Sequence, residues 1–146
     1  NQTLVMDGNN PNWETASGGG ASTASVTGTS TFSTDSTSFV DVTNVTLTLP
    51  TTTAQSEDCL FTFCGGTTVG SVGNNIVFQL LNDSTVVGLA KNEPTAIDTV
   101  IGSISLQGIT DADGGTGKLQ MKISGGNASS LIGSGTQYQM LTAFAS

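Results

Sequence analysis

The sequence of 146 residues contains no histidine and no arginine, and its basic side chains are three lysines. Without histidine, catalytic sites built on a Ser-His-Asp or Cys-His arrangement are excluded. Three lysines against eleven acidic residues give a net charge of −8, so the chain cannot neutralise a phosphate backbone or an anionic bilayer as basic proteins do. We therefore expect no nucleic acid and no membrane among its partners.

Long apolar stretches and zinc-ligand clusters are also missing. No run of about 18 consecutive apolar residues is present, and so we predict no membrane-spanning segment. The two cysteines, Cys59 and Cys64, are five residues apart in one apolar run, and an odd spacing in a strand puts side chains on opposite faces. We therefore expect two free thiols, no zinc site and no cofactor.

Carboxylates remain as candidates for metal binding and catalysis. The segment Asp111-Ala112-Asp113-Gly114 is similar to the start of a calcium loop. The twelfth position of such a loop should be an acidic ligand, but here it is Lys122, and so we interpret the segment as a turn and expect no metal. A glycosidase needs one pair of carboxylates, but most acidic residues fall at turn positions, where the backbone favours Asp. We expect no enzymatic activity.

The sequence is rich in small polar residues and in alternating apolar residues. Serine and threonine together supply 41 residues, glycine supplies 19, and 10% of the residues are charged. Apolar residues alternate with polar ones between turn signals such as Gly65-Gly66 and Asn82-Asp83, as in half-buried strands. The predicted strands cover residues 45–49, 58–64, 76–81, 86–90, 101–109, 118–123 and 137–144. Residues 95–101 are too β-branched for a helix. The pattern predicts an all-β jelly-roll β-sandwich of about 8–10 antiparallel strands.

The start of the chain differs from the rest. Leu4, Val5 and Met6 form a short apolar run before an Asp7-Gly8 turn signal, and Trp13 follows. We predict a small hairpin, with residues 1–22 as an N-terminal arm and linker and residues 23–146 as the jelly-roll domain. Leu4, Val5, Met6 and Trp13 are our candidates for attachment to a partner surface, although Trp13 is as well explained by packing within the hairpin.

Several segments resemble bacteriophage proteins. The opening NQTLVMDGNNPNW resembles a segment of tail-fibre and head-fibre proteins. Three further segments resemble the C1q/TNF-like jelly-roll domains of phage fibres and capsid decoration (cement) proteins: STSFVDVTNVTLTLPTT, NNIVFQLLNDSTVVGLA and KLQMKISGGNASSLIGSGTQYQMLTAFAS. The resemblance implies a homotrimer whose apolar strand faces meet near a three-fold axis. The candidate interface residues are Val77, Leu81, Tyr138 and Phe144.

Two functions compatible with this resemblance differ in the partner. The first is a non-enzymatic decoration or cement protein at the virion surface, a homotrimer that binds the major capsid protein through its N-terminal arm. The alternative is the receptor-binding tip of a tail or head fibre, joined to a fibre stalk and binding a host cell-surface receptor. If the chain is such a fibre tip, we expect the loops 67–75 and 111–117 to contact the receptor. These loops contain no aromatic residue, which favours the decoration protein.

Overall fold

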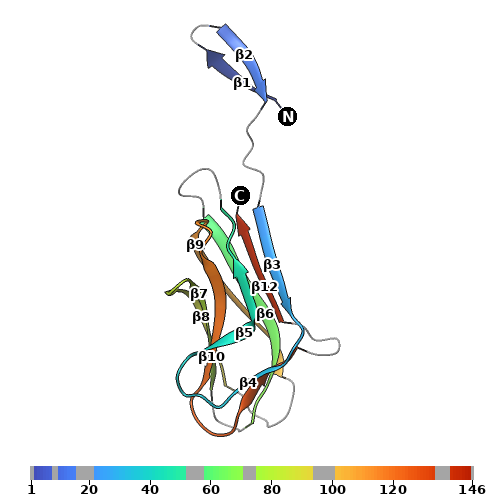
Figure 1. Ribbon diagram of the computed structural model, residues 1–146, viewed down its shortest axis with the longest axis vertical. Helices are drawn as coiled ribbons and strands as arrows, with labels where there is room; N and C mark the ends of the chain where they lie inside the picture. Colours follow the sequence, from blue (N-terminus) through green and yellow to red (C-terminus); the bar gives the residue numbers. More distant parts are fainter. Residues whose placement is uncertain are drawn as a thin grey trace.

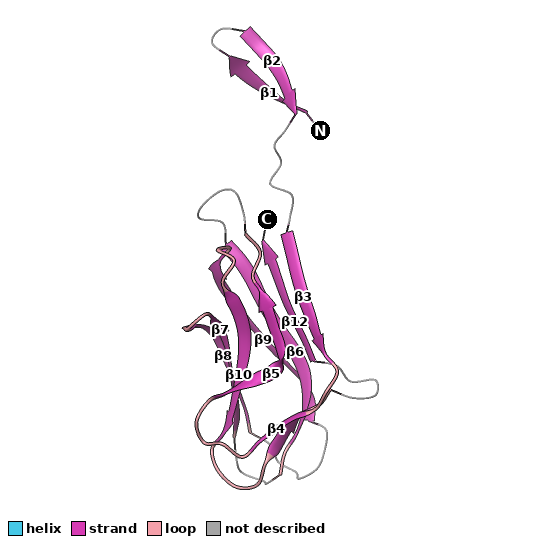
Figure 2. Cartoon of the chain, viewed as in Figure 1, coloured by secondary structure: helices cyan, strands magenta, loops and turns pink. Residues whose placement is uncertain are grey.

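The described part of the chain is built from β-strands (Figure 1). The computed structural model describes residues 2–7, 10–15, 22–51, 58–70, 75–93, 101–133 and 139–145. These residues contain no helix, and hence none that is long and apolar enough to cross a membrane (Figure 2). The strands are β1 (Gln2–Asp7), β2 (Asn10–Thr15), β3 (Ser22–Gly28), β4 (Phe32–Thr34), β5 (Val40–Thr48), β6 (Asp58–Thr68), β7 (Ile76–Asn82), β8 (Thr85–Asn92), β9 (Ile101–Asp111), β10 (Thr116–Ile123), β11 (Ser129–Leu131) and β12 (Gln139–Ala145).

The strands from β3 to β12 form two sheets. The larger sheet has six strands. In it, β6 pairs with the outermost strand β9 along one edge and with β12 and β11 along the other, and β3 pairs with β12 and β4 with β11. The smaller sheet has the order β5-β10-β7-β8. The first two strands, β1 and β2, pair with each other as a separate antiparallel hairpin, which agrees with the hairpin predicted from the Asp7-Gly8 signal.

The order of pairing identifies the sandwich as a jelly roll. Five antiparallel pairs are nested inside one another: β7 with β8, β6 with β9, β5 with β10, β4 with β11, and β3 with β12. Such nesting results when one long hairpin folds over on itself to make two sheets. The predicted fold is therefore confirmed. It also brings the end of the chain beside the start of the domain, since Ala145 is the register partner of Ser22.

The core lies between the two sheets, and alternate residues of β6, β10 and β12 are buried in it. On β10, Leu119, Met121 and Ile123 are buried, as the sequence pattern predicts. Phe63 of the larger sheet stacks on Phe78 of the smaller one, with ring centroids 6.2 Å apart and planes at 26°. Burial of each large apolar side chain contributes roughly 1.5–3 kcal/mol to folding, so this interlayer packing holds the two sheets together.

The prediction that Gly65-Gly66 ends a strand is wrong. β6 continues through both glycines to Thr68, and its pairing with β9 shifts register between Gly65 and Thr67. Glycine inside a strand commonly marks such an irregularity. A Cβ atom on Gly65 would lie 2.8 Å from the Phe63 ring, so the absence of a side chain lets the strand continue. Thr67 and Thr68, the first residues of a predicted contact loop, are therefore strand residues.

Candidate interaction surface

The outer face of the six-stranded sheet carries a row of exposed apolar side chains. Alternate residues of β6 face the core, and this turns Leu60 outward. Leu60 is directly opposite Ile109 of β9 on one side and Phe144 of β12 on the other. The exposed fractions are 65% for Ile109, 42% for Leu60 and 43% for Phe144. We call these three residues the apolar row.

Acidic residues border one end of the apolar row. Asp58 of β6 is directly opposite Asp111 of β9, and both are exposed. Each lies two residues from a member of the row, Leu60 and Ile109 respectively, and so shares its face of the sheet. Like charges directly opposite each other repel. This end of the face therefore carries a concentrated negative charge beside apolar surface.

The two cysteines lie on opposite sides of the same strand. Cys59 is buried in the core, Cys64 is half-buried on the outer face, and both are free thiols, as predicted. Burial raises the pKa of the Cys59 thiol, which makes its reactive thiolate scarcer. On the outer face, Cys64 is directly opposite Met140 of β12, which is also exposed. The outer face therefore carries apolar and sulfur-containing side chains beyond the row itself.

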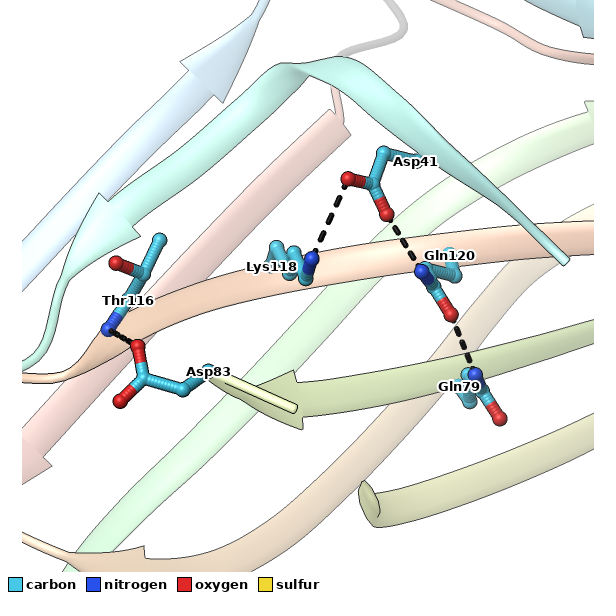
Figure 3. Close-up of polar contacts among 6 residues, drawn as sticks. All are labelled: Asp41, Gln79, Asp83, Thr116, Lys118 and Gln120. Atoms are coloured by element: carbon cyan, nitrogen blue, oxygen red, sulfur yellow. Dashed lines mark hydrogen bonds and ion pairs between the residues drawn. The ribbon is translucent and has the colours of Figure 1, made fainter. Parts of the chain in front are cut away.

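The outer face of the smaller sheet carries a chain of polar contacts (Figure 3). Gln79 donates from Nε2 to Gln120 Oε1 at 2.5 Å, and Gln120 donates from Nε2 to Asp41 Oδ1 at 2.6 Å. Lys118 Nζ lies 3.3 Å from the other oxygen of Asp41. The hydrogen bond from Gln120 and the nearby Lys118 lower the pKa of Asp41. These contacts connect β7, β10 and β5 across the face.

A second exposed apolar site lies on β8, at the edge of the same face. Leu89 is 61% exposed, and Lys91, two residues further along the strand, is exposed as well. The register pairs Leu89 with Gln79 and Lys91 with Val77, so these four residues share the outer face of the smaller sheet. An apolar and a basic side chain therefore stand next to each other at this edge.

The segment from Asp111 to Gly115 is held by hydrogen bonds within the chain. The backbone N–H of Gly115 donates to Asp113 Oδ1 at 2.8 Å, and Asn82 Nδ2 donates to both carboxylate oxygens of Asp113 at 3.3 Å. The Gly115 N–H and then Asn82 lower the pKa of Asp113. Gly114 adopts a left-handed φ of 76°, as glycine does in tight turns. In the parts of the chain that the structure describes, no group of three or more cysteine or acidic side chains is placed to hold a metal ion.

The predicted interface residues fall on different faces. Phe144 belongs to the apolar row of the larger sheet, whereas Val77 and Leu81 lie on β7 of the smaller sheet. Val77 is half-buried, and Leu81 is 5% exposed. Leu81 therefore has little surface left for a partner. Tyr138 lies outside the described residues. The structure thus does not bring the four residues together on one surface.

The candidate attachment residues lie in the N-terminal hairpin. The backbone register pairs Leu4 with Trp13, Val5 with Asn12 and Met6 with Pro11. Directly opposite residues of an antiparallel pair share a face of the ladder. Leu4, Met6, Pro11 and Trp13 are therefore positions on one face, and Val5 is on the other.

Leu60, Ile109 and Leu89 were not among the predicted site residues. Their signal in the sequence is an apolar residue out of phase with its strand: Leu60 sits between Cys59 and Phe61, and Ile109 breaks the phase of Ile104 and Leu106. Such residues are ambiguous in a sequence, because a strand covered on both faces produces the same pattern. The register across β9, β6 and β12 identifies Leu60 and Ile109, together with Phe144, as one surface. Leu89 lies apart from them, on β8 of the smaller sheet.

No known family model matches the chain, and no curated protein matches it. Support for a function therefore comes from the chain's own surfaces and from the resemblance of its sequence segments.

Proposed function

We propose that this chain is a non-enzymatic structural protein of a bacteriophage virion. It assembles as a homotrimer of jelly rolls and decorates the capsid, to which it attaches through its N-terminal hairpin. The observation that carries the proposal is the apolar row of Leu60, Ile109 and Phe144, side by side on an outer sheet face.

The apolar row supports self-association. Contiguous exposed apolar side chains on a small domain mark interaction sites more often than isolated ones do. Phe144, Leu60 and Ile109 come from three neighbouring, hydrogen-bonded strands of one sheet, so their side-by-side arrangement is fixed by the fold. Most soluble oligomers are symmetric assemblies of one chain. A copy of the same chain is therefore the partner that we propose for this face.

The hairpin supports attachment to a further surface. It is a two-stranded sheet of its own, and an isolated two-stranded hairpin is marginally stable in water. The positions Leu4, Met6 and Trp13 share one face of its ladder. Docking of that face on another protein would provide the packing that two strands lack. In a decoration protein, this other protein is the major capsid protein.

The virion setting is supported by the sequence. Its surface relies on serine and threonine hydroxyls more than on charge, since 10% of the residues are charged. The resemblance of four sequence segments to phage fibre and decoration proteins points to the same setting.

Light-scattering mass and capsid binding test this proposal together. We would compare the full chain, a chain without residues 1–16, and the variant Phe144→Ser. The full chain should have about three times the 14.7 kDa mass of one copy and bind undecorated capsids. Loss of residues 1–16 should abolish capsid binding but leave the trimer intact. Phe144→Ser should shift the mass toward one copy at concentrations where the wild type is trimeric.

Other outcomes would contradict the proposal in different ways. A stable monomer of the full chain at all accessible concentrations would refute the trimer. A trimer that does not bind capsids but binds host cells would refute the decoration protein and support the receptor-binding tip of a fibre. A trimer that binds capsids equally well without residues 1–16 would refute attachment through the hairpin.

A further inference from the structure

Two outer faces of the domain carry matching pairs of apolar and charged side chains. On the larger sheet, Leu60 and Asp58 are two residues apart on β6, and Ile109 and Asp111 are two residues apart on β9. On the smaller sheet, Leu89 and Lys91 are two residues apart on β8. All six residues are exposed. The apolar parts match each other, and the charged parts have opposite sign.

We propose that these two faces bind each other between neighbouring copies of the chain. Leu89 of one copy packs on Leu60 and Ile109 of the next, and Lys91 lies between Asp58 and Asp111. This inference rests on the self-association proposed above and specifies its contact.

The spacing of the charged and apolar side chains allows both contacts at once. Two residues along a strand span about 6.8 Å, and this separation is the same for Leu89 and Lys91 as for Leu60 and Asp58. The Cβ atoms of directly opposite residues are about 5 Å apart, so one ammonium group fits between the carboxylates of Asp58 and Asp111. Docking the apolar residues therefore aligns the charges.

Lys91 is the lysine that is available for this role. Lys118 is paired with Asp41 at 3.3 Å, and Lys122 Nζ lies 4.4 Å from the centre of the Phe39 ring. Among the described residues, Lys91 has no ion pair or ring contact of this kind. An ammonium group from a second copy would also relieve the repulsion between Asp58 and Asp111.

The proposed contact joins two different surfaces, and this limits the symmetry of the assembly. A contact between unlike surfaces forms a closed ring when the rotation between copies closes, and an open filament when it does not. The proposed trimer is the closed case with three copies. Val77 is the register partner of Lys91, and Phe144 is the register partner of Leu60. The predicted interface residues Val77 and Phe144 thus belong to the two faces that meet. This explains why one copy does not bring them together.

Charge reversal tests the contact. Lys91→Glu alone, and Asp58→Lys with Asp111→Lys, should each weaken association about 30-fold or more, because each leaves like charges facing each other. The triple variant that combines all three changes reverses both sides and should recover association. Asp35→Lys is the charge control, since it changes the net charge by two units, as Lys91→Glu does in the other direction, but is exposed between β4 and β5, outside the strands that carry the proposed contact. We expect its association to stay within about threefold of the wild type, because solvent screens an exposed charge outside the contact.

Sedimentation equilibrium of the full chain, with melting curves to verify folding, provides the readout. If the wild type and both charge variants are equally trimeric, the Lys91 contact is wrong while the proposed trimer stands. If the triple variant folds but fails to recover association, the contact is likewise wrong. If the wild type is a monomer at all concentrations, both this contact and the proposed trimer fail. Association restored in the triple variant alone supports the contact.

Discussion

Asp83 and Thr116 are joined by two hydrogen bonds that run in opposite directions. The backbone N–H of Asp83 donates to the Thr116 carbonyl at 2.8 Å. The backbone N–H of Thr116 donates to Asp83 Oδ1 at 2.9 Å, and Figure 3 shows this second hydrogen bond. Asp83 has a left-handed φ of 52°, a conformation that Asp and Asn tolerate better than most side chains. The turn between β7 and β8 is thereby fixed to the start of β10.

Replacing Asp83 should therefore destabilise the domain. We expect Asp83→Ala to lower the free energy of unfolding by about 1–2 kcal/mol, because the Thr116 N–H loses its acceptor and alanine fits the left-handed conformation poorly. Asp83→Asn keeps a side-chain oxygen and the tolerance for this φ, and should retain most of the stability. Urea unfolding of the three proteins measures the difference. Equal midpoints for Ala and wild type would show that this link contributes nothing.

Neighbouring residues on β6 should respond to mutation in opposite ways. Phe61 is fully buried, whereas Leu60 beside it is exposed. Phe61→Ala should cost about 3–5 kcal/mol of stability through lost burial and a cavity. Leu60→Ala should cost less than about 1 kcal/mol but weaken association. Unfolding is measured at protein concentrations too low for self-association, so that oligomer formation does not contribute to the stability. A large stability loss for Leu60→Ala in this range would contradict its outward placement.

The sequence predicts which side of a strand is buried, but it does not predict which strands pair with one another. The alternation of Leu119, Met121 and Ile123 determines which side of β10 is buried, and the Asn82-Asp83 signal locates the hairpin between β7 and β8. The apolar row depends on β6 lying between β9 and β12, whose pairings join residues 49 and 84 positions apart for Leu60. Local patterns carry no information about such distant pairings. For the same reason, the sequence pattern does not reveal that Leu81, a predicted interface residue, is only 5% exposed.

Gly108 should not tolerate a larger residue, because the edges of β8 and β9 meet at this position. A Cβ atom at this position would lie 2.3 Å from the carbonyl oxygen of Val87 on β8, too close for any real contact. Gly108→Ala should therefore force β8 and β9 apart and destabilise the domain by about 1–3 kcal/mol. Ser105→Ala, at an exposed position of the same strand, is the control and should change stability by about 0.5 kcal/mol or less. Thermal unfolding of Gly108→Ala and Ser105→Ala measures the difference in stability. Similar melting temperatures for the two variants would argue against a close approach of the two edges.

Asp41 should contribute to the pH dependence of stability. Its pKa is lowered in the folded protein, first by the hydrogen bond from Gln120. A lowered pKa means that folding favours the charged carboxylate, so the contribution is fully present above the ordinary Asp value of about 3.9 and is lost as pH falls through the folded pKa. Asp41→Asn should therefore be less stable than the wild type at pH 7, with a difference that shrinks below about pH 3.9. Urea midpoints across this range provide the test, and a constant difference would exclude the carboxylate charge as its cause.

The two thiols should differ in reactivity and report on different events. Cys59 is buried and its raised pKa reduces the thiolate that reacts, so a thiol reagent should modify it only after unfolding. Cys64 is half-buried on the outer face of the larger sheet, so it should react in the native state.

Because Cys64 and Phe144 lie on the same outer face, association through that face should slow modification of Cys64 as protein concentration rises. The Phe144→Ser variant should lose this concentration dependence while Cys59 stays protected. The test is to label the Cys59→Ser and Cys64→Ser variants separately over a range of concentrations. If the rate at Cys64 does not depend on concentration although the protein is trimeric, the trimer contact must lie away from this part of the face.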